Sequence, residues 1–165
     1  MIVRVADRND DLAAFGRIVI DAYRALPGFV SDPGYEQYIE DVAARFDDAA
    51  LVVAFDDGGA PLGCVTYVAD ASSSIAEFDE ADAAGFRMLG VRPAAQGSGA
   101  GRALVSWCIE QARSDGKARV IIHSTDAMRR AHRLYESLGF TRDPARDWEP
   151  VPALWLRRFV LDLGS

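Results

Sequence analysis

The chain has 165 residues, of which half are hydrophobic and 26% are charged, and its 18 basic and 25 acidic residues give a net charge of −7. This composition is typical of one ordinary globular domain, which we expect over residues 1–165. The acidic balance argues against a general nucleic-acid binder. Since no apolar run approaches the roughly 18 residues of a membrane span, and no leader precedes the first strand, we expect a cytoplasmic protein.

The first half of the chain has the pattern of a strand, two helices and a hairpin. A short strand is predicted at 2–5, and Asp7 or Asn9 is placed to cap a helix whose apolar residues recur at helical spacing from Leu12 to Tyr23. The stretch LPGFVSDPG breaks the chain, and a second helix is predicted over about 35–46. The strands ALVVAF and LGCVTYV flank DDGGAP, which is a strong signal for a hairpin turn.

The second half alternates strands and helices. The acidic stretch at 71–85 is predicted to be a loop with at most one helical turn, and the strand FRMLGV leads into a glycine run and a helix. The buried strand RVIIHS and a helix that Gly139 ends come next, followed by a loop at 141–152 and a last strand at 153–163. The order βααβββαβαβ, with an optional short strand near Phe140, indicates a mixed α/β fold with helices flanking one sheet.

The cysteines and histidines give no sign of a metal centre. Cys64 and Cys108 lie in apolar stretches, so we expect buried, reduced thiols. His123 and His132 are the only histidines, and they are expected to be structural. No metal site is therefore predicted.

The run QGSGAGR at 96–102 places three glycines at alternate positions between a predicted strand and a predicted helix. A Walker A loop would need a Lys-Ser or Lys-Thr pair, which the chain lacks, and a dinucleotide fingerprint would need glycine where Arg102 stands. A glycine-rich turn at a helix N-terminus still favours an anion, because backbone N–H groups and the helix dipole face it. Arg92 and Arg102 would add positive charge. The alternative, a simple helix cap, needs one glycine rather than three.

The glycine run resembles a signature of the GNAT superfamily of N-acetyltransferases, (Arg or Gln)-x-x-Gly-x-(Gly or Ala), which here reads QGSGAG. The resemblance implies that the loop wraps the pyrophosphate of acetyl-CoA and that the preceding strand pairs with the pantetheine arm. It also implies that the strands FRMLGV and RVIIHS splay apart to admit that arm. The residues expected to bind acetyl-CoA are Leu89, Val91, Gln96, Gly97, Ser98, Gly99, Ala100, Gly101 and Arg102.

A second segment, AHRLYESLGF at 131–140, is similar to the superfamily's A-x-x-L-Y-x-x-x-G-F pattern. Tyr135 is the expected catalytic acid, because a phenol beside the sulfur can protonate the CoA thiolate as it leaves. The alternative is that Tyr135 is one more core aromatic residue. The resemblance implies an acyltransferase that moves acetyl directly from the thioester to a primary amine of an undetermined small molecule or peptide.

Two positions depart from the superfamily's pattern. An asparagine that helps to hold the cofactor commonly stands where this chain has Met128, and histone-type members carry a glutamate base where it has Gly85. These departures favour an alternative function, a CoA-binding regulatory or degenerate domain without turnover. The intact glycine loop and Tyr135 favour the enzyme.

The base and the acceptor site are less defined by the sequence. Replacement bases are sought in the acidic loop among Glu77, Asp79, Glu80 and Asp82, and the alternative for each of them is a solvated surface position. In this architecture the acceptor would lie near Phe29, Tyr35, Tyr38 and the 141–150 stretch, with Trp148 as a pocket residue. The expected partners are acetyl-CoA and an amine acceptor, with a homodimer as an option, and neither nucleic acid nor a membrane.

Overall fold

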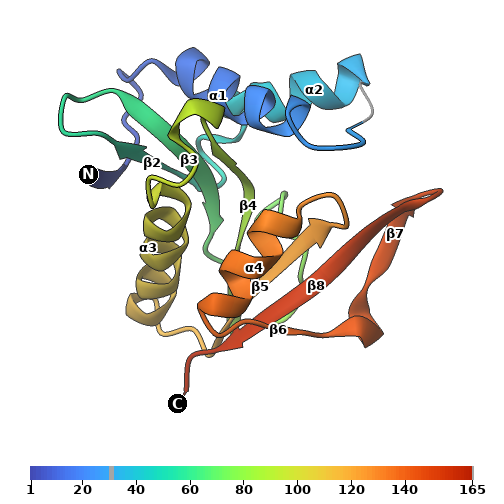
Figure 1. Cartoon of the computed structure of the whole chain (residues 1–165). Coiled ribbons are helices and arrows are strands. Elements are labelled where there is room, and N and C mark those ends of the chain that lie inside the picture. The colour runs from blue at the N-terminus through green and yellow to red at the C-terminus, as the bar shows by residue number, and fades with distance from the viewer. Residues whose placement is uncertain (30–31, 165) are drawn as a thin grey trace.

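The computed structural model describes residues 1–29 and 32–164, and in it a sheet of eight strands is covered by helices on both faces (Figure 1). The strands are β1 Ile2–Val5, β2 Ala50–Phe55, β3 Pro61–Val68, β4 Ala83–Val91, β5 Arg119–Thr125, β6 Thr141–Arg142, β7 Trp148–Val151 and β8 Leu154–Asp162. The α-helices are α1 Leu12–Arg24, α2 Pro33–Glu40, α3 Ala100–Ser114 and α4 Arg129–Ser137. Short 3-10 helices lie at Val42–Arg45, Pro93–Ala95 and Pro144–Arg146. The predicted mixed α/β fold is confirmed.

The strands run in the order β1-β2-β3-β4-β5-β8-β6, and β7 pairs with β8 beside this path. Every pair is antiparallel except β4 with β5, which are parallel and lie at the centre of the sheet. One core lies between α1 and the sheet, where Phe15 and Val19 pack with Val53 and Cys64. The other core lies under α3 and α4. Both cysteines are buried free thiols, as predicted.

The first half differs from the prediction at two helix ends. Asp11, rather than Asp7 or Asn9, caps α1, because its carboxylate accepts from the backbone N–H of Ala14 at 3.0 Å. The second predicted helix stops at Glu40, and Asp41 caps a separate 3-10 turn. The buried guanidinium of Arg45 donates to backbone carbonyls at the end of α2, and this clamp makes the chain turn where the apolar spacing alone predicted one continuous helix. Positions 30 and 31 of the preceding break lie outside the described residues.

The second half contains more strand than the prediction. β4 begins at Ala83, three residues early, because three small buried residues there pair with β5. The stretch at 141–152, predicted as a loop, holds β6, which corresponds to the optional strand near Phe140, and β7. β7 forms because Trp148 and Val151 pair with Leu156 and Leu154 of β8 despite Pro150, and such edge positions tolerate proline.

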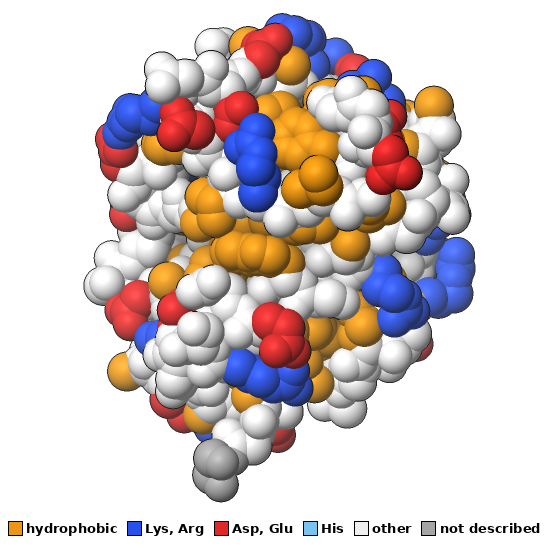
Figure 2. Space-filling view, turned by 90° about the vertical axis from the view of Figure 1, so that its left-hand side faces the viewer, with side chains coloured by type: hydrophobic (Ala, Val, Ile, Leu, Met, Phe, Trp, Pro, Cys, Tyr) orange, Lys and Arg blue, Asp and Glu red, His pale blue; other side chains and the backbone are white. Residues whose placement is uncertain are grey.

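Helix α3 is tied to the sheet at its C-terminal end. The Tyr67 hydroxyl on β3 donates to the Asp115 carboxylate at 2.7 Å, just beyond the last turn of α3, and Lys117 pairs with Asp70 at 2.9 Å. A cavity of about 480 Å³ lies beside this end of the helix, with Tyr67 and Trp107 among its lining residues. Figure 2 looks onto the side of the molecule that carries α3 and shows hydrophobic side chains gathered in the middle of that face.

Candidate active site

The central parallel pair of strands opens into a gap. β4 and β5 are in register only at three pairs, from Ala83 with Arg119 to Gly85 with Ile121, although β4 continues to Val91 and β5 to Thr125. Beyond Gly85 the strands part, which confirms the predicted splay. Among the described residues, the edge of β4 that faces β5 has no further ladder pairing from Phe86 onward.

A β-bulge turns β4 at this gap. Cys64 pairs with Gly90 and Thr66 with Arg87, so one residue of β3 lies opposite both Met88 and Leu89. Met88 has φ of 56°, in the left-handed region that side chains rarely adopt. Such a bulge bends its strand and increases the local twist.

Beyond the bulge, the hydrogen-bond pattern sets which way the backbone of β4 points. The Arg92 N–H donates to the Leu62 carbonyl of β3 at 2.8 Å. Because successive residues of an antiparallel strand alternate between the two sides, the backbone groups of Val91 and Leu89 point toward the gap. These are the two strand residues that the sequence predicted to pair with the pantetheine arm.

The glycine loop follows β4 directly and leads into α3. Gly97 and Gly99 have φ of 87° and 90°, a region that favours glycine. Gly99 is the N-cap of α3 and has no side chain with which to cap it. The Ala100 N–H makes a long hydrogen bond of 3.4 Å to the Ser98 hydroxyl, and the N–H groups of Gly101 and Arg102 have no acceptor among the described residues, so they can serve a ligand. From Gly97 to Gly99 the loop is exposed. The predicted phosphate site thus has the backbone geometry that an anion requires.

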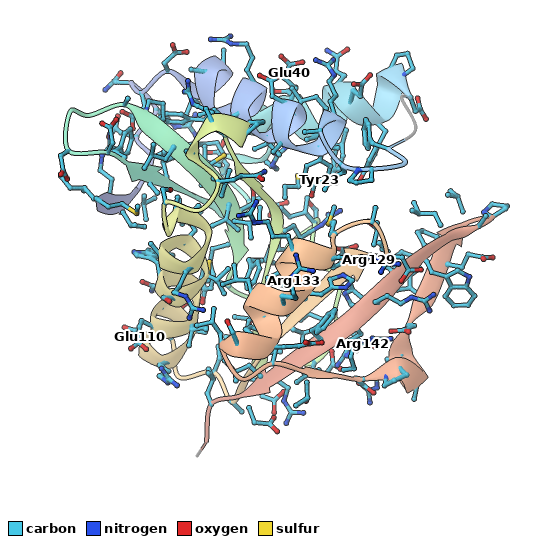
Figure 3. The ribbon with its side chains drawn as sticks, in the orientation of Figure 1. Tyr23, Glu40, Glu110, Arg129, Arg133 and Arg142 are labelled. Atoms are coloured by element: carbon cyan, nitrogen blue, oxygen red, sulfur yellow. The ribbon has the colours of Figure 1, made fainter. Side chains whose placement is uncertain are left out.

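Helix α4 lies against this loop and brings positive charge to it. The Arg130 guanidinium donates to the Gln96 side chain at 2.7 Å, and Arg102 donates to the Ser137 hydroxyl at 2.7 Å. Arg129 and Arg133 project from the same helix (Figure 3). These α4 arginines were not predicted from the sequence, although Arg130 and Arg133 follow Arg129 by one and four residues on a predicted helix. In a chain with a net charge of −7, this basic surface fits a polyanion.

Tyr135 lies at the point where β4 and β5 part. Its side chain is 5% exposed, and its ring packs against those of Phe86, Phe140 and Phe159 at centroid distances of 5.7 to 5.8 Å. Burial raises the pKa of the phenol above its ordinary value of 10.0, so the hydroxyl keeps its proton at neutral pH. The aromatic packing fixes the ring, and the protonated hydroxyl is the form that an acid needs.

The position that carries an asparagine in the superfamily's pattern has a different local role here. Met128 is the N-cap residue of α4 and makes no side-chain cap. Its sulfur accepts from the Ser124 hydroxyl at 3.3 Å, and its side chain packs against the core under α1 that contains Tyr23. Residue 128 therefore joins α4 to this core by apolar contact, whereas an asparagine there would cap the helix.

The four acidic loop residues lie in different environments. Asp79 is exposed, Asp82 pairs with Arg119 at 3.0 Å, and Glu80 is held by Arg158 and Arg146. The hydrogen bond from Arg158 offsets burial and lowers the pKa of Glu80.

Glu77 alone of these four lines a small cavity where the strands part, which in this structure is too narrow for a water molecule. Arg87 and His123 line the same cavity.

The two histidines also differ. His132 contacts the Ser124 hydroxyl at 3.0 Å and lies on the Phe159 ring, as a structural residue would. In His123, Nδ1 is buried without a hydrogen-bond partner among the described residues. Burial and the charge of Arg158 lower the pKa of His123 to about 4, so the imidazole is neutral at neutral pH.

The aromatic residues that the sequence predicted near the acceptor lie in different surroundings. Tyr35 and Tyr38 are exposed on α2, and Arg87 of β4 donates to the Tyr38 hydroxyl at 3.2 Å. Phe29 packs edge to face on Tyr23 with centroids 6.5 Å apart.

Tyr23 points from α1 toward the side where α4 begins (Figure 3), and burial raises the pKa of its phenol. The sequence reasoning treated Tyr23 only as a core residue. Trp148 is exposed on β7, farther along the β7–β8 hairpin.

Two wider features of the described residues bear on function. None of the helices combines the length and the apolar character needed to cross a membrane. Within the same ranges, no group of three or more His, Cys, Asp or Glu side chains is arranged to hold a metal ion.

A gap between the central parallel strands, a glycine loop at its end and a basic helix beside that loop together form an arrangement that suits a long anionic ligand. The chain belongs to the acetyltransferase (GNAT) family, whose sequence model matches residues 12–140. The matched span includes the glycine loop and Tyr135.

Known proteins agree with this assignment. The structure of yncA from Salmonella typhimurium with its cofactor acetyl-CoA is 26% identical, with a TM-score of 0.67 over 100% of this chain and 95% of the other. A ribosomal-protein-alanine N-acetyltransferase from Brucella melitensis shares the fold, with a TM-score of 0.69, 22% identity and 99% and 100% coverage. A mycothiol acetyltransferase from Beutenbergia cavernae is 33% identical over 108 residues, which are 62% of this chain and 34% of that relative.

Proposed function

We propose that this protein is an N-acetyltransferase that moves the acetyl group of acetyl-CoA directly to a primary amine. The observation that carries the proposal is the parting of β4 and β5 beyond Gly85, with the glycine loop at one end of the gap and Tyr135 where the strands part. The family and the acetyl-CoA bound in the yncA structure support the identity of the donor.

In this proposal, different residues at the gap bind different parts of acetyl-CoA. Leu89 and Val91 offer backbone groups to the pantetheine amides, as an added strand would receive them. The loop wraps the pyrophosphate through Gln96, Gly97, Ser98, Gly99, Ala100, Gly101 and Arg102. No metal takes part in this proposal.

The proposed reaction passes through one tetrahedral intermediate. The lone pair of a neutral amine forms a bond to the thioester carbonyl carbon while the C=O π pair moves to oxygen, and the nitrogen then gives up a proton to a base or to water. The carbonyl re-forms as the intermediate collapses. The electron pair of the C–S bond leaves with sulfur, and Tyr135 passes its proton to the departing thiolate. The phenolate recovers a proton from solvent. Acetylated amine and free CoA are the products.

The acceptor is proposed as an amine with some apolar body, because Tyr35, Tyr38 and Trp148 supply aromatic surface on that side. A cytoplasmic location and a homodimer stay proposals as well. For the homodimer, the exposed Ile2 and Val5 on edge strand β1 offer an unpaired apolar edge, and sedimentation of the purified chain tests it.

The alternative is a CoA-binding domain without turnover, which Met128 and Gly85 favour. A panel of alkylamines, amino acids and peptides with free α-amino groups, incubated with acetyl-CoA and followed by release of free thiol, separates the two. Acetylation of at least one amine, with a slower rate in Tyr135→Phe, supports the enzyme. Tight binding of acetyl-CoA with no thiol released by any amine supports the alternative.

A further inference from the structure

The polar residues nearest to the point where the strands part lie on the sheet face opposite Tyr135. The small cavity at that point has Phe86, which contacts Tyr135, in its wall together with Glu77, Arg87 and His123. An amine that approached a thioester in the gap from this face would meet these three polar side chains. One of them can serve as the proton acceptor that the reaction needs.

The structure explains why a strand glutamate is missing at Gly85. A β-carbon at that position would lie 2.5 Å from the Ile121 carbonyl oxygen and 2.8 Å from the Phe78 ring. Neither distance is tolerable, and the carbonyl belongs to the backbone of the neighbouring strand. Glycine is therefore required here, and the space beside it is taken by Phe78.

Phe78 also fixes the position of the preceding residue, Glu77. Its buried ring packs with Val68, Ala83 and Ile121, which anchors the acidic loop against the start of β4. Glu77 comes directly before it and pairs with Arg87, with Nε 2.8 Å from Oε1. The loop thus brings a carboxylate to the cavity that a side chain at Gly85 could not reach.

The environment of Glu77 suits a proton acceptor. The carboxylate is 17% exposed, and burial raises its pKa although the charge of Arg87 opposes this shift. The ion pair with Arg87 holds the carboxylate in place through Oε1. The other groups that face it are His123 on β5, Tyr23 on α1 and Tyr35 on α2, of which none is a cation at neutral pH.

We propose that Glu77 is the general base of the acetyl transfer, an inference that rests on the proposed function. As the amine nitrogen bonds to the thioester carbon it becomes acidic, and Glu77 takes its proton while the C–S electron pair leaves with sulfur. Tyr135 protonates the sulfur from the opposite face. The proton on Glu77 passes to solvent before the next turnover.

The test compares Glu77→Gln with Asp79→Asn, which changes an exposed carboxylate of the same loop. Both are assayed with the best amine of the panel, and acetyl-CoA affinity and melting temperature are measured in parallel. Glu77→Gln should lower kcat by about 10²- to 10⁴-fold with the dissociation constant of acetyl-CoA within about threefold, and Asp79→Asn should match the parent. A kcat within threefold of the parent overturns the proposal, and a large loss in His123→Gln instead would assign the role to His123.

A second variant keeps the proposal testable if Glu77→Gln does not fold. Formate added to Glu77→Ala should restore part of its turnover, and it should not raise that of Asp79→Ala. No rise in Glu77→Ala overturns the base. A parent that binds acetyl-CoA but acetylates no amine overturns the proposed function itself, and the base with it, whereas an active parent with an unaffected Glu77→Gln overturns only the base.

Discussion

Tyr135 on α4 packs edge to face against Phe86 on β4, with ring centroids 5.8 Å apart and planes inclined by 62°. Phe86 is the first residue of β4 beyond the ladder with β5. The contact therefore ties the proposed acid to the residue at which the sheet opens. A small movement of α4 would shift the phenol relative to the gap, which is why the packing around this ring matters for chemistry.

Replacing Tyr135 by phenylalanine should lower kcat by about 10²- to 10⁴-fold, the usual contribution of a general acid. The ring contacts with Phe86, Phe140 and Phe159 survive, so the dissociation constant of acetyl-CoA should stay within a few fold. Steady-state kinetics and calorimetric titration measure the two quantities. An unchanged kcat would leave Tyr135 as a core residue.

Replacing Gly101 by valine should weaken acetyl-CoA binding at least tenfold, because the side chain would occupy the approach of the pyrophosphate. The first added carbon meets only Leu134 and Val91, at 3.5 and 3.6 Å, so the fold should survive. Gly99 is a poorer test because φ of 90° strains any side chain.

Thermal unfolding gives a second measure of acetyl-CoA binding by Gly101→Val. At one hundred times its dissociation constant, acetyl-CoA should stabilise the parent by about 2.7 kcal/mol, or roughly 5 to 10 °C. Gly101→Val should lose most of that shift at the same acetyl-CoA concentration, and Gly58→Val in the distant hairpin turn should keep it. A Gly101→Val protein that shifts like the parent would mean that the loop is only a helix cap.

Arg130→Met should weaken acetyl-CoA binding by about 2- to 10-fold, since it removes the hydrogen bond that holds Gln96 and one charge beside the loop. Arg113→Met, which removes an exposed arginine from the far end of α3, is the matched control and should bind normally. Titrations at low and high salt check the electrostatic part, which should shrink as salt is added. Equal affinities for the two variants would exclude Arg130 from the site.

His123 should make the fold less stable in acid. Its pKa is about 4 in the folded protein and 6.5 when unperturbed, so the unfolded chain binds the proton more readily between these values. Stability is then fully present above pH 6.5 and is lost as the pH falls toward 4, by at most about 1.4 kcal/mol per pH unit.

Urea unfolding of the parent and of His123→Gln at pH 7 and pH 5 isolates this contribution. Because the ring is partly exposed, we expect the parent to lose about 1 kcal/mol more than the variant between the two pH values. Equal losses would show that His123 titrates normally in the folded state.

Local patterns predicted the elements well, and long-range contacts decided the exceptions. Helical spacing could not show that Arg45 turns the chain at Asp41, because its carbonyl partners are met only after folding. Likewise, Pro150 and Pro152 suggested a loop where β7 forms through its pairing with β8.

In the candidate site, too, some residues could be predicted from local motifs and others only from the folded structure. The glycine loop and Tyr135 are contiguous motifs, and the structure places them at the gap that the resemblance implied. The acidic loop offered four equivalent carboxylates, and only the packing of Phe78 on Gly85 distinguishes Glu77 from the others. Local sequence cannot predict a role that depends on which side chain reaches a cavity in the folded protein.

The anchoring of α3 at both ends affects the free energy of ligand binding. Tyr67 fixes the helix beyond its C-terminus through Asp115, and Arg102 joins its first turn to Ser137 of α4. Because α3 is fixed to the sheet at one end and to α4 at the other, its N-terminal amide groups are already in place before a phosphate binds. Binding then carries little ordering cost, and most of the interaction free energy remains for holding the thioester where the strands part.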